Sequence, residues 1–140
     1  MGQNKPTMSH LRTILIADDD ENDVFFLKRL LDKTGEYRLQ IVHDGNNAIR
    51  YLAGEGEYAD RARYPAPCCV ILDLKLPKKD GLEILEWMQT HENYAGIPAL
   101  VCSGLDSDDH VERARELGAF SFSPKPPDPL QVSALLASMD

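Results

Sequence analysis

Residues 13–20 read TILIADDD, a continuous apolar run that ends in three consecutive aspartates. A run without alternating polar residues indicates a strand that is buried on both faces, as in a parallel sheet. The residues that follow repeat apolar side chains at helical spacing, and Gly35 provides a helix stop. This part of the chain therefore predicts one strand and one helix, joined by an acidic turn.

The same strand–helix unit occurs five times along the chain. The predicted strands are 13–17, 39–42, 68–72, 98–102 and 120–123. Two predicted helices have their apolar positions at 24–31 and 48–52, two more span 82–91 and 107–117, and the last begins at Asp128-Pro129. Asp44 and Ser107 are predicted helix caps, and Gly118 is a predicted helix stop. Residues 54–67, GEGEYADRARYPAP, form a long connecting loop. This alternation predicts a doubly wound α/β domain, with five parallel strands and helices on both faces of the sheet.

The totals fit one acidic domain and exclude several classes of function. The chain has 140 residues, and 15 Lys and Arg against 23 Asp and Glu leave a net charge of −8. This charge argues against binding to the phosphate backbone of nucleic acids or to an anionic membrane surface. No apolar run approaches the roughly 20 residues of a membrane span, and the N-terminus lacks a signal-peptide pattern. We expect a polar leader at 1–11, one domain at 12–140 and a cytoplasmic location.

The cysteines and histidines do not form a metal-binding pattern. Cys68, Cys69 and Cys102 lie in predicted strands, and the four histidines are scattered without ligand spacing. We therefore expect buried thiols in a reducing compartment rather than a zinc site.

Chemically useful side chains follow four of the five predicted strands. Asp18 and Asp19 follow the first strand, Asp73 the third, Ser103 the fourth and Lys125 the fifth. The carboxyl ends of parallel strands meet at one edge of an open sheet, and ligands bind there. These side chains are therefore expected to lie close together.

Carboxylates gathered at one edge raise one another's pKa values unless a cation binds between them. Oxygen ligands favour Mg²⁺, and the lack of histidine and cysteine at these positions argues against zinc and copper. A carboxylate beside Mg²⁺ can attack phosphorus and form an aspartyl phosphate. A lysine ammonium and a hydroxyl can stabilise the charge on the transferring group. The strand ends therefore predict phosphoryl-transfer chemistry with Mg²⁺ as the cofactor.

Four separated motifs carry a family resemblance. They are ILIADDD at 14–20, VILDLKLPKKDG at 70–81, LVCSG at 100–104 and SPKP at 123–126. Together they resemble the CheY-like receiver domain of bacterial response regulators, over about residues 12–138. The resemblance implies a flavodoxin-like (βα)5 three-layer sandwich, in which the parallel strands have the order 2-1-3-4-5.

The resemblance also implies a metal site and a phosphoacceptor. Asp18, Asp19 and Asp73 would ligate Mg²⁺, together with the backbone carbonyl of Lys75. Asp73 would be the nucleophile that accepts the phosphoryl group. Asp20 would have a structural role beside them.

The remaining motif residues are implied to bind the phosphoryl group and to switch the domain. Ser103 and Lys125 would bind the phosphoryl oxygens, and Gly104 would leave room for them. A cis peptide bond would follow Lys125. Ser103 and Phe122 would be the switch residues, where Phe122 replaces the tyrosine that is frequent in the family.

The implied function is that of a single-domain response regulator in a two-component phosphorelay. A histidine kinase or a phosphotransfer protein would donate the phosphoryl group. The domain would catalyse its own phosphorylation and dephosphorylation without being a turnover enzyme. Because the sequence stops at Asp140, we expect output through contact with a downstream protein or through phosphorelay, with the protein a monomer or a homodimer. An exposed Phe25 or Phe26 is a candidate contact for the kinase. The motif DDDEND at 18–23, the loop EGEYADRAR and the motif LPKKDG are similar to regulators partnered with phytochrome-type histidine kinases.

Two alternatives use the same residues differently. A haloacid-dehalogenase-type phosphohydrolase needs a second acid two residues after the nucleophile, where this chain has Lys75. A receiver-like binding module that is not phosphorylated would be expected to lack Asp73, the acidic pair or Lys125, and none of them is missing. A purely structural reading of the first aspartates, as caps of the following helix, is also open.

Overall fold

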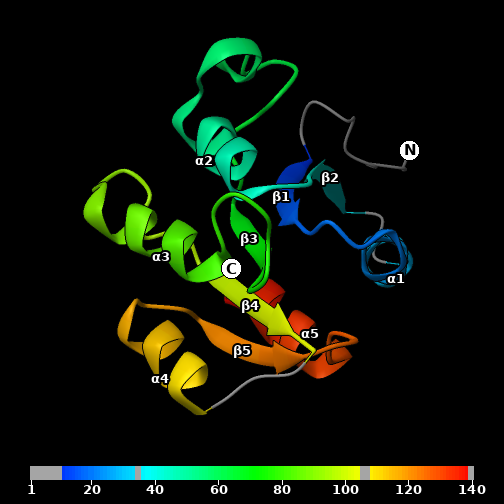
Figure 1. Cartoon of the computed structure of the whole chain (residues 1–140). Helices are drawn as coiled ribbons and strands as arrows, with labels where there is room; N and C mark the ends of the chain where they lie inside the picture. The colour runs from blue at the N-terminus through cyan, green and yellow to red at the C-terminus, as the bar shows by residue number, and fades with distance from the viewer. Residues whose placement is uncertain (1–10, 34–35, 105–107, 139–140) are drawn as a thin grey trace.

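The computed structural model describes residues 11–33, 36–104 and 108–138, and these contain a five-stranded parallel sheet. The strands are β1 (Arg12–Ala17), β2 (Tyr37–Val42), β3 (Cys69–Asp73), β4 (Ala99–Ser103) and β5 (Ser121–Pro124). Their order is β2-β1-β3-β4-β5, which confirms the predicted order (Figure 1). The predicted boundary between residues 11 and 12 stays a prediction, because residues 1–10 lie outside the described part.

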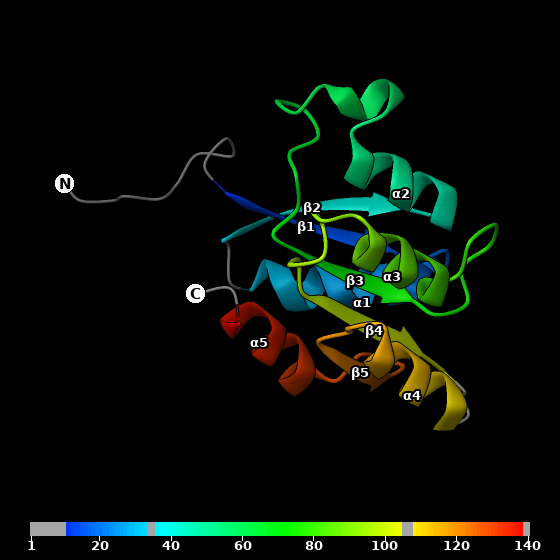
Figure 2. The same cartoon turned by 90° about the vertical axis from the view of Figure 1, so that its left-hand side faces the viewer.

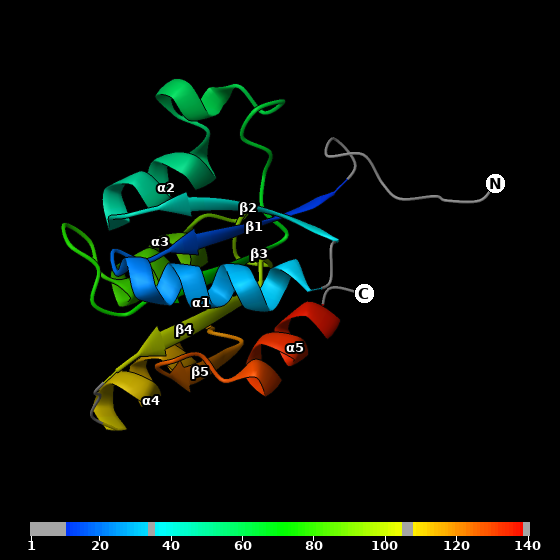
Figure 3. The ribbon, with the colours of Figure 1, turned by 90° about the vertical axis from the view of Figure 1, so that its right-hand side faces the viewer.

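Helices cover both faces of this sheet. They are α1 (Glu21–Asp32), α2 (Gly45–Ala53), α3 (Gly81–Thr90), α4 (Asp108–Glu116) and α5 (Pro129–Ala137). Figure 2 looks onto the face with α2, α3 and α4, and Figure 3 looks onto the face with α1 and α5. The α/β three-layer sandwich predicted from the sequence is therefore confirmed.

Alternate residues of the central strands supply two separate cores. In β1, Leu15 and Ala17 belong to the core under α2 and α3, while Ile14 and Ile16 belong to the core under α1 and α5. All residues of β3 and β4 are buried. Burial on both faces explains why these strands are continuous apolar runs in the sequence.

Aspartates begin four of the helices. Asp20, Asp44, Asp80 and Asp128 are the N-caps of α1, α2, α3 and α5, and each side chain accepts a hydrogen bond from a backbone N–H of the first turn. This confirms the predicted caps Asp44 and Asp128. Gly118 follows α4 with a φ of 87°, as expected of a helix stop. The predicted stop Gly35 and the predicted cap Ser107 lie outside the described residues.

The structure differs from the prediction at strand ends and in one loop. Asp73 and Ser103 are the last residues of β3 and β4 rather than the first residues after them, because the parallel register continues through both positions. Strand β2 begins at Tyr37, two residues earlier than predicted.

Among the described residues, no helix has the length and apolar character to cross a membrane.

The loop at 54–67 is more ordered than its Gly-rich and charged composition indicated. It contains a short 3-10 helix, η2 (Gly56–Ala59), and packs Tyr58 and Tyr64 against the fully buried Tyr51 of α2. The Arg61 guanidinium donates hydrogen bonds to the carbonyls of Tyr51, Leu52 and Tyr64, at 2.8–3.1 Å. We call Tyr51, Tyr58, Arg61 and Tyr64 the tyrosine brace.

Candidate functional site

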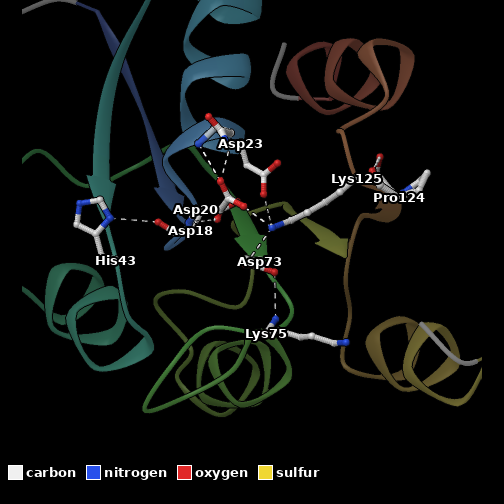
Figure 4. A network of polar contacts seen from close by, with 10 residues as sticks. Asp18, Asp20, Asp23, His43, Asp73, Lys75, Pro124 and Lys125 are labelled. Carbon is white, nitrogen blue, oxygen red and sulfur yellow. Dashed lines mark hydrogen bonds and ion pairs between the residues drawn. The ribbon is translucent and has the colours of Figure 1, made fainter. Parts of the chain in front are cut away.

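The predicted site residues meet at the carboxyl end of the sheet. Asp18 directly follows β1, Asp73 ends the neighbouring β3, and Lys125 follows β5 and reaches across to both carboxylates (Figure 4). We call Asp18, Asp19, Asp73 and Lys125 the acidic pocket. Their approach follows from the strand order, because β1 and β3 are neighbours and their carboxyl ends point the same way.

Three carboxylates of the pocket could hold a divalent cation. Asp18, Asp19 and Asp73 each offer an oxygen, and these oxygens lie within 4.8 Å of one another. Asp18 and Asp73 are buried, while Asp19 is exposed and leaves one side open to solvent. An all-oxygen set with an open side fits a hard cation such as Mg²⁺, which keeps several of its water ligands.

Asp18 is held in place but is electrostatically unfavourable as an anion. Its backbone N–H donates to the carbonyl of Val42, and its Oδ1 accepts the backbone N–H of Asp20 at 2.9 Å. Burial raises the pKa of Asp18 to about 6, and the charge of Asp73 adds to this effect, while the Asp20 N–H and Lys125 oppose it. A bound divalent cation would relieve this cost, which is a second reason to place a cation here.

Asp73 has a defined orientation at the end of β3. Its Oδ1 accepts the backbone N–H of Lys75 at 3.1 Å, and its Oδ2 lies 3.0 Å from Lys125 Nζ. The following loop folds back, and the N–H of Gly81 donates to the carbonyl of Leu74 at 2.9 Å. A Cβ at position 81 would lie only 2.9 Å from the Asp73 carbonyl oxygen, so a glycine is needed for the chain at position 81 to pass this close to Asp73. From the sequence, Asp80 and Gly81 indicate a turn and a helix start without a chemical role, and α3 does begin at Gly81.

Lys125 is surrounded by carboxylates. Its Nζ lies 2.7 Å from Asp23 Oδ2, 3.0 Å from Asp73 Oδ2 and 3.3 Å from Asp18 Oδ2. Burial lowers the pKa of Lys125, but the hydrogen bonds to Asp23 and Asp73 and the charge of Asp18 outweigh burial and raise the pKa above its ordinary value. The peptide bond between Lys125 and Pro126 is cis, as the family resemblance implied.

Ser103 supplies a hydroxyl without a partner. Its side chain is 2% exposed, and its Oγ has no hydrogen-bond partner among the described residues. Leaving a buried hydroxyl unpaired costs about 1–3 kcal/mol, so each such group calls for an explanation, and at this edge of the sheet a bound ligand is one. The hydroxyls of Thr13 and Ser121 are also unpartnered among the described residues. Gly104, which follows Ser103, is exposed, and among the described residues other than its chain neighbour no atom lies within 4 Å of where a Cβ would stand.

Two other predicted site residues, Lys75 and Phe122, lie outside the cluster of charged side chains. The Lys75 side chain is exposed, and the assignment of its carbonyl as a metal ligand stays a prediction. Phe122 is half-buried on β5 and lines a cavity of about 300 Å³ together with Val111, Ala114 and Phe120. The ring therefore has space beside α4 into which it could move.

The sequence interpretation missed Asp23, which makes the shortest contact to Lys125. Asp23 lies in the first turn of α1, one turn before the buried Leu27. Residues four apart share a helix face, so the burial of Leu27 was a signal that Asp23 also faces the sheet. Its partner, however, is 102 residues away along the chain.

Comparisons with known proteins agree with this geometry. Residues 14–137 match the family model of the response regulator receiver domain. The chain is 33% identical over 107 residues to response regulator Rcp1 of Synechocystis sp., covering 76% of this chain and 71% of that protein. The phosphorylated cyanobacterial phytochrome response regulator RcpA superposes with a TM-score of 0.77 at 28% identity, over 92% of this chain and 89% of its own. The Mn²⁺-bound form of Rcp1 gives a TM-score of 0.77 at 28% identity, over 91% of this chain and 88% of its own.

Proposed function

The chain belongs to the response regulator receiver family, and from that premise we propose that it accepts a phosphoryl group on Asp73 from a histidine kinase or a phosphotransfer protein. One observation carries the proposal. The buried Asp73 carboxylate lies beside two further carboxylates, within 4.8 Å, and 3.0 Å from a lysine ammonium. This arrangement supplies a nucleophile, a cation site and a positive charge at one point.

The proposed step is a displacement at phosphorus. An oxygen of Asp73 forms a bond to phosphorus as the bond between phosphorus and the donor's histidine nitrogen breaks. The nitrogen keeps the electron pair of the broken bond and takes up a proton from water, so the imidazole leaves as a neutral ring. The reverse fate, hydrolysis, transfers the phosphoryl group to water and restores the carboxylate.

The chain's own residues hold the reacting groups. Asp18, Asp19, Asp73 and the carbonyl of Lys75 would hold Mg²⁺, which when bound supplies positive charge to the crowded carboxylates and to the phosphoryl oxygens. The N–H of Lys75 orients the Asp73 carboxylate through its Oδ1. Lys125 donates to a phosphoryl oxygen, and the unpartnered Ser103 hydroxyl gains its missing hydrogen bond there.

Phosphorylation would shift the domain between two conformations. A Ser103 hydroxyl drawn toward the phosphoryl group moves the end of β4, and the Phe122 ring repacks in the cavity between α4 and β5. The surface around α4 and β5 would then favour a different protein partner, which is a population shift driven by the new charge. The output is a change in protein contact, and the domain promotes its own phosphorylation and dephosphorylation.

The relatives suggest the kind of kinase. RcpA, one of the solved structures that this chain resembles, is a cyanobacterial phytochrome response regulator, and we propose a phytochrome-type histidine kinase as the donor. The Phe25 side chain on α1 is 61% exposed and beside Phe26 lines an apolar groove between α1 and Pro129, which fits a contact with that partner. Reduced Cys68, Cys69 and Cys102 suit the cytoplasm, where such a kinase has ATP.

Intact-protein mass spectrometry after incubation with acetyl phosphate tests the proposal. The wild-type protein is expected to gain one phosphoryl group in the presence of Mg²⁺ and none after chelation. Asp73→Asn is expected to gain none. Asp80→Asn is the matched control, because it removes a carboxylate from the same loop while asparagine remains a good helix cap. A folded wild-type protein that gains no adduct would instead support a receiver-like binding module.

A further inference from the structure

Lys125 has more partners than phosphoryl binding requires. An ammonium has three N–H donors, and three carboxylates, Asp23, Asp73 and Asp18, lie within 3.3 Å of its Nζ. The ammonium is therefore already paired with carboxylates before any phosphoryl group arrives, and its shortest hydrogen bond goes to Asp23 Oδ2 at 2.7 Å. A phosphoryl oxygen that binds Lys125 must share the ammonium with these carboxylates.

Asp23 differs from the other two carboxylates. Asp18 and Asp73 belong to the oxygen cluster that could hold a cation, whereas Asp23 does not. Asp23 is also not needed as a helix cap, because the Asp20 side chain accepts the backbone N–H groups of Asn22 and Asp23. The Asp23 carboxylate is mostly buried, with 17% of the side chain exposed, and directed at Lys125.

A bound cation would sharpen this difference. It would draw Asp18 and Asp73 toward itself and away from the ammonium, because both carboxylates would then have a doubly charged partner. Asp23 would keep its contact of 2.7 Å with Lys125. In the phosphorylated domain, Asp23 and the phosphoryl oxygens therefore share one ammonium. The negative charge of Asp23 competes electrostatically, because it neutralises Lys125 and repels the phosphoryl group.

We propose that Asp23 is a positioning residue that competes with the phosphoryl group for Lys125 and so weakens retention of that group on Asp73. This inference rests on the proposed function. It predicts that neutralising Asp23 strengthens binding of a phosphoryl group while it weakens binding of the cation alone, since the freed lysine then pairs more with Asp18 and Asp73.

Beryllium fluoride, an inorganic mimic of a phosphoryl group, provides the test. Its affinity is measured by ¹⁹F NMR at saturating Mg²⁺, and the affinity for Mg²⁺ alone by calorimetry, on wild type, Asp23→Asn and Glu21→Gln. Glu21 is the matched control, because it is exposed, lies in the same helical turn and loses the same charge. Thermal unfolding shows that each variant is folded.

Asp23→Asn is expected to bind beryllium fluoride about tenfold more tightly, the effect of losing one charge-assisted hydrogen bond to a competitor. Its Mg²⁺ affinity is expected to fall, and Glu21→Gln to resemble wild type in both measurements. Equal or weaker beryllium fluoride binding by Asp23→Asn would overturn the inference, and a merely loosened α1 would weaken both ligands. A wild-type protein that binds no beryllium fluoride would overturn the proposed function and this inference with it.

Discussion

The acidic pocket and the tyrosine brace both bury polar groups, but they satisfy them differently. In the brace, the Tyr51 hydroxyl donates to the carbonyl of Pro65 at 2.8 Å, and Arg61 donates to three carbonyls. In the pocket, the Ser103 hydroxyl has no partner among the described residues, and burial disfavours the Asp18 anion. From this comparison we expect the satisfied brace to stabilise the fold, and the incompletely satisfied pocket to gain its missing partners from a ligand.

The same contrast holds for ionisation. Burial raises the pKa of Tyr51 to about 12, so its hydroxyl stays neutral at any physiological pH. Burial raises the pKa of Asp18 to about 6, which brings its ionisation close to physiological pH. Burial raises both pKa values, but Tyr51 stays neutral at physiological pH, whereas the charge of Asp18 changes with pH near the physiological range.

The largest effect is expected from the centre of the brace. Tyr51→Ala should lower the free energy of unfolding by about 3–5 kcal/mol, because it empties a fully buried aromatic position. Tyr51→Phe should cost only about 1 kcal/mol, since it removes the hydrogen bond to Pro65 and keeps the ring. Urea unfolding followed by circular dichroism measures both. A cost below that of Tyr51→Phe for the alanine variant would mean that the brace does not stabilise the fold.

A smaller loss is expected from the arginine of the brace. Arg61→Met keeps much of the aliphatic chain and removes the hydrogen bonds to three carbonyls, which should cost about 2–3 kcal/mol. Arg63→Met is the control, because its side chain is exposed and stacks only over the Tyr64 ring. Equal urea midpoints for the two variants would contradict the role assigned to Arg61.

In the pocket, we expect removal of a polar contact to raise the free energy of unfolding rather than lower it. The pKa of Asp18 is about 6 when folded and 3.8 when unperturbed, so the folded protein binds more protons between these values. Stability without divalent cations should therefore fall as pH rises from about 4 to about 6. Asp18→Asn should remove this dependence and raise the free energy of unfolding at pH 7 by about 1–2 kcal/mol, less than the full pKa shift because Lys125 loses a partner.

Urea unfolding at pH 4.5 and pH 7, with a chelator present, measures this effect. Asp60→Asn is the control, since Asp60 lies in the exposed part of the 54–67 loop. A loss of stability in Asp18→Asn at pH 7 would show that the buried carboxylate stabilises the fold, and the contrast with the brace would then be wrong.

The reactivity of the cysteine thiols offers a further test, one that does not depend on a change in stability. Burial, with the charges of Asp18 and Asp73 adding to it, raises the pKa of Cys102 near the pocket to about 12. The thiol of Cys68, at the opposite end of the sheet, is partly exposed and donates to the carbonyl of Thr13, and the neighbouring Cys69 lowers the pKa of Cys68 to about 7. Iodoacetamide at pH 7.5 should therefore label Cys68 alone, as read by tandem mass spectrometry, and Cys68→Ser should abolish labelling. Labelling of Cys102 would show that the buried end of β4, beside the acidic pocket, becomes accessible to solvent.

The sequence predicted those parts of the molecule that depend on local pattern. Asp18 and Asp73 could be placed because each ends an apolar strand, and the parallel topology brings such ends together. Asp23 could not be assigned, because its role depends on where the first turn of α1 meets Lys125. The tyrosine brace was missed for a similar reason, since its rings and Arg61 find their partners only when the loop at 54–67 folds back on α2.

The central claim is that Asp73 is the phosphoacceptor, and one measurement addresses it directly. After incubation with acetyl phosphate and Mg²⁺, borohydride reduction converts an aspartyl phosphate to homoserine, and the tryptic peptide 64–75 contains Asp73 as its only acidic residue. The account predicts that this peptide alone carries the mass change of one reduced aspartate. A mass change in the peptide that holds Asp18, Asp19 and Asp23, with peptide 64–75 unaltered, would contradict it.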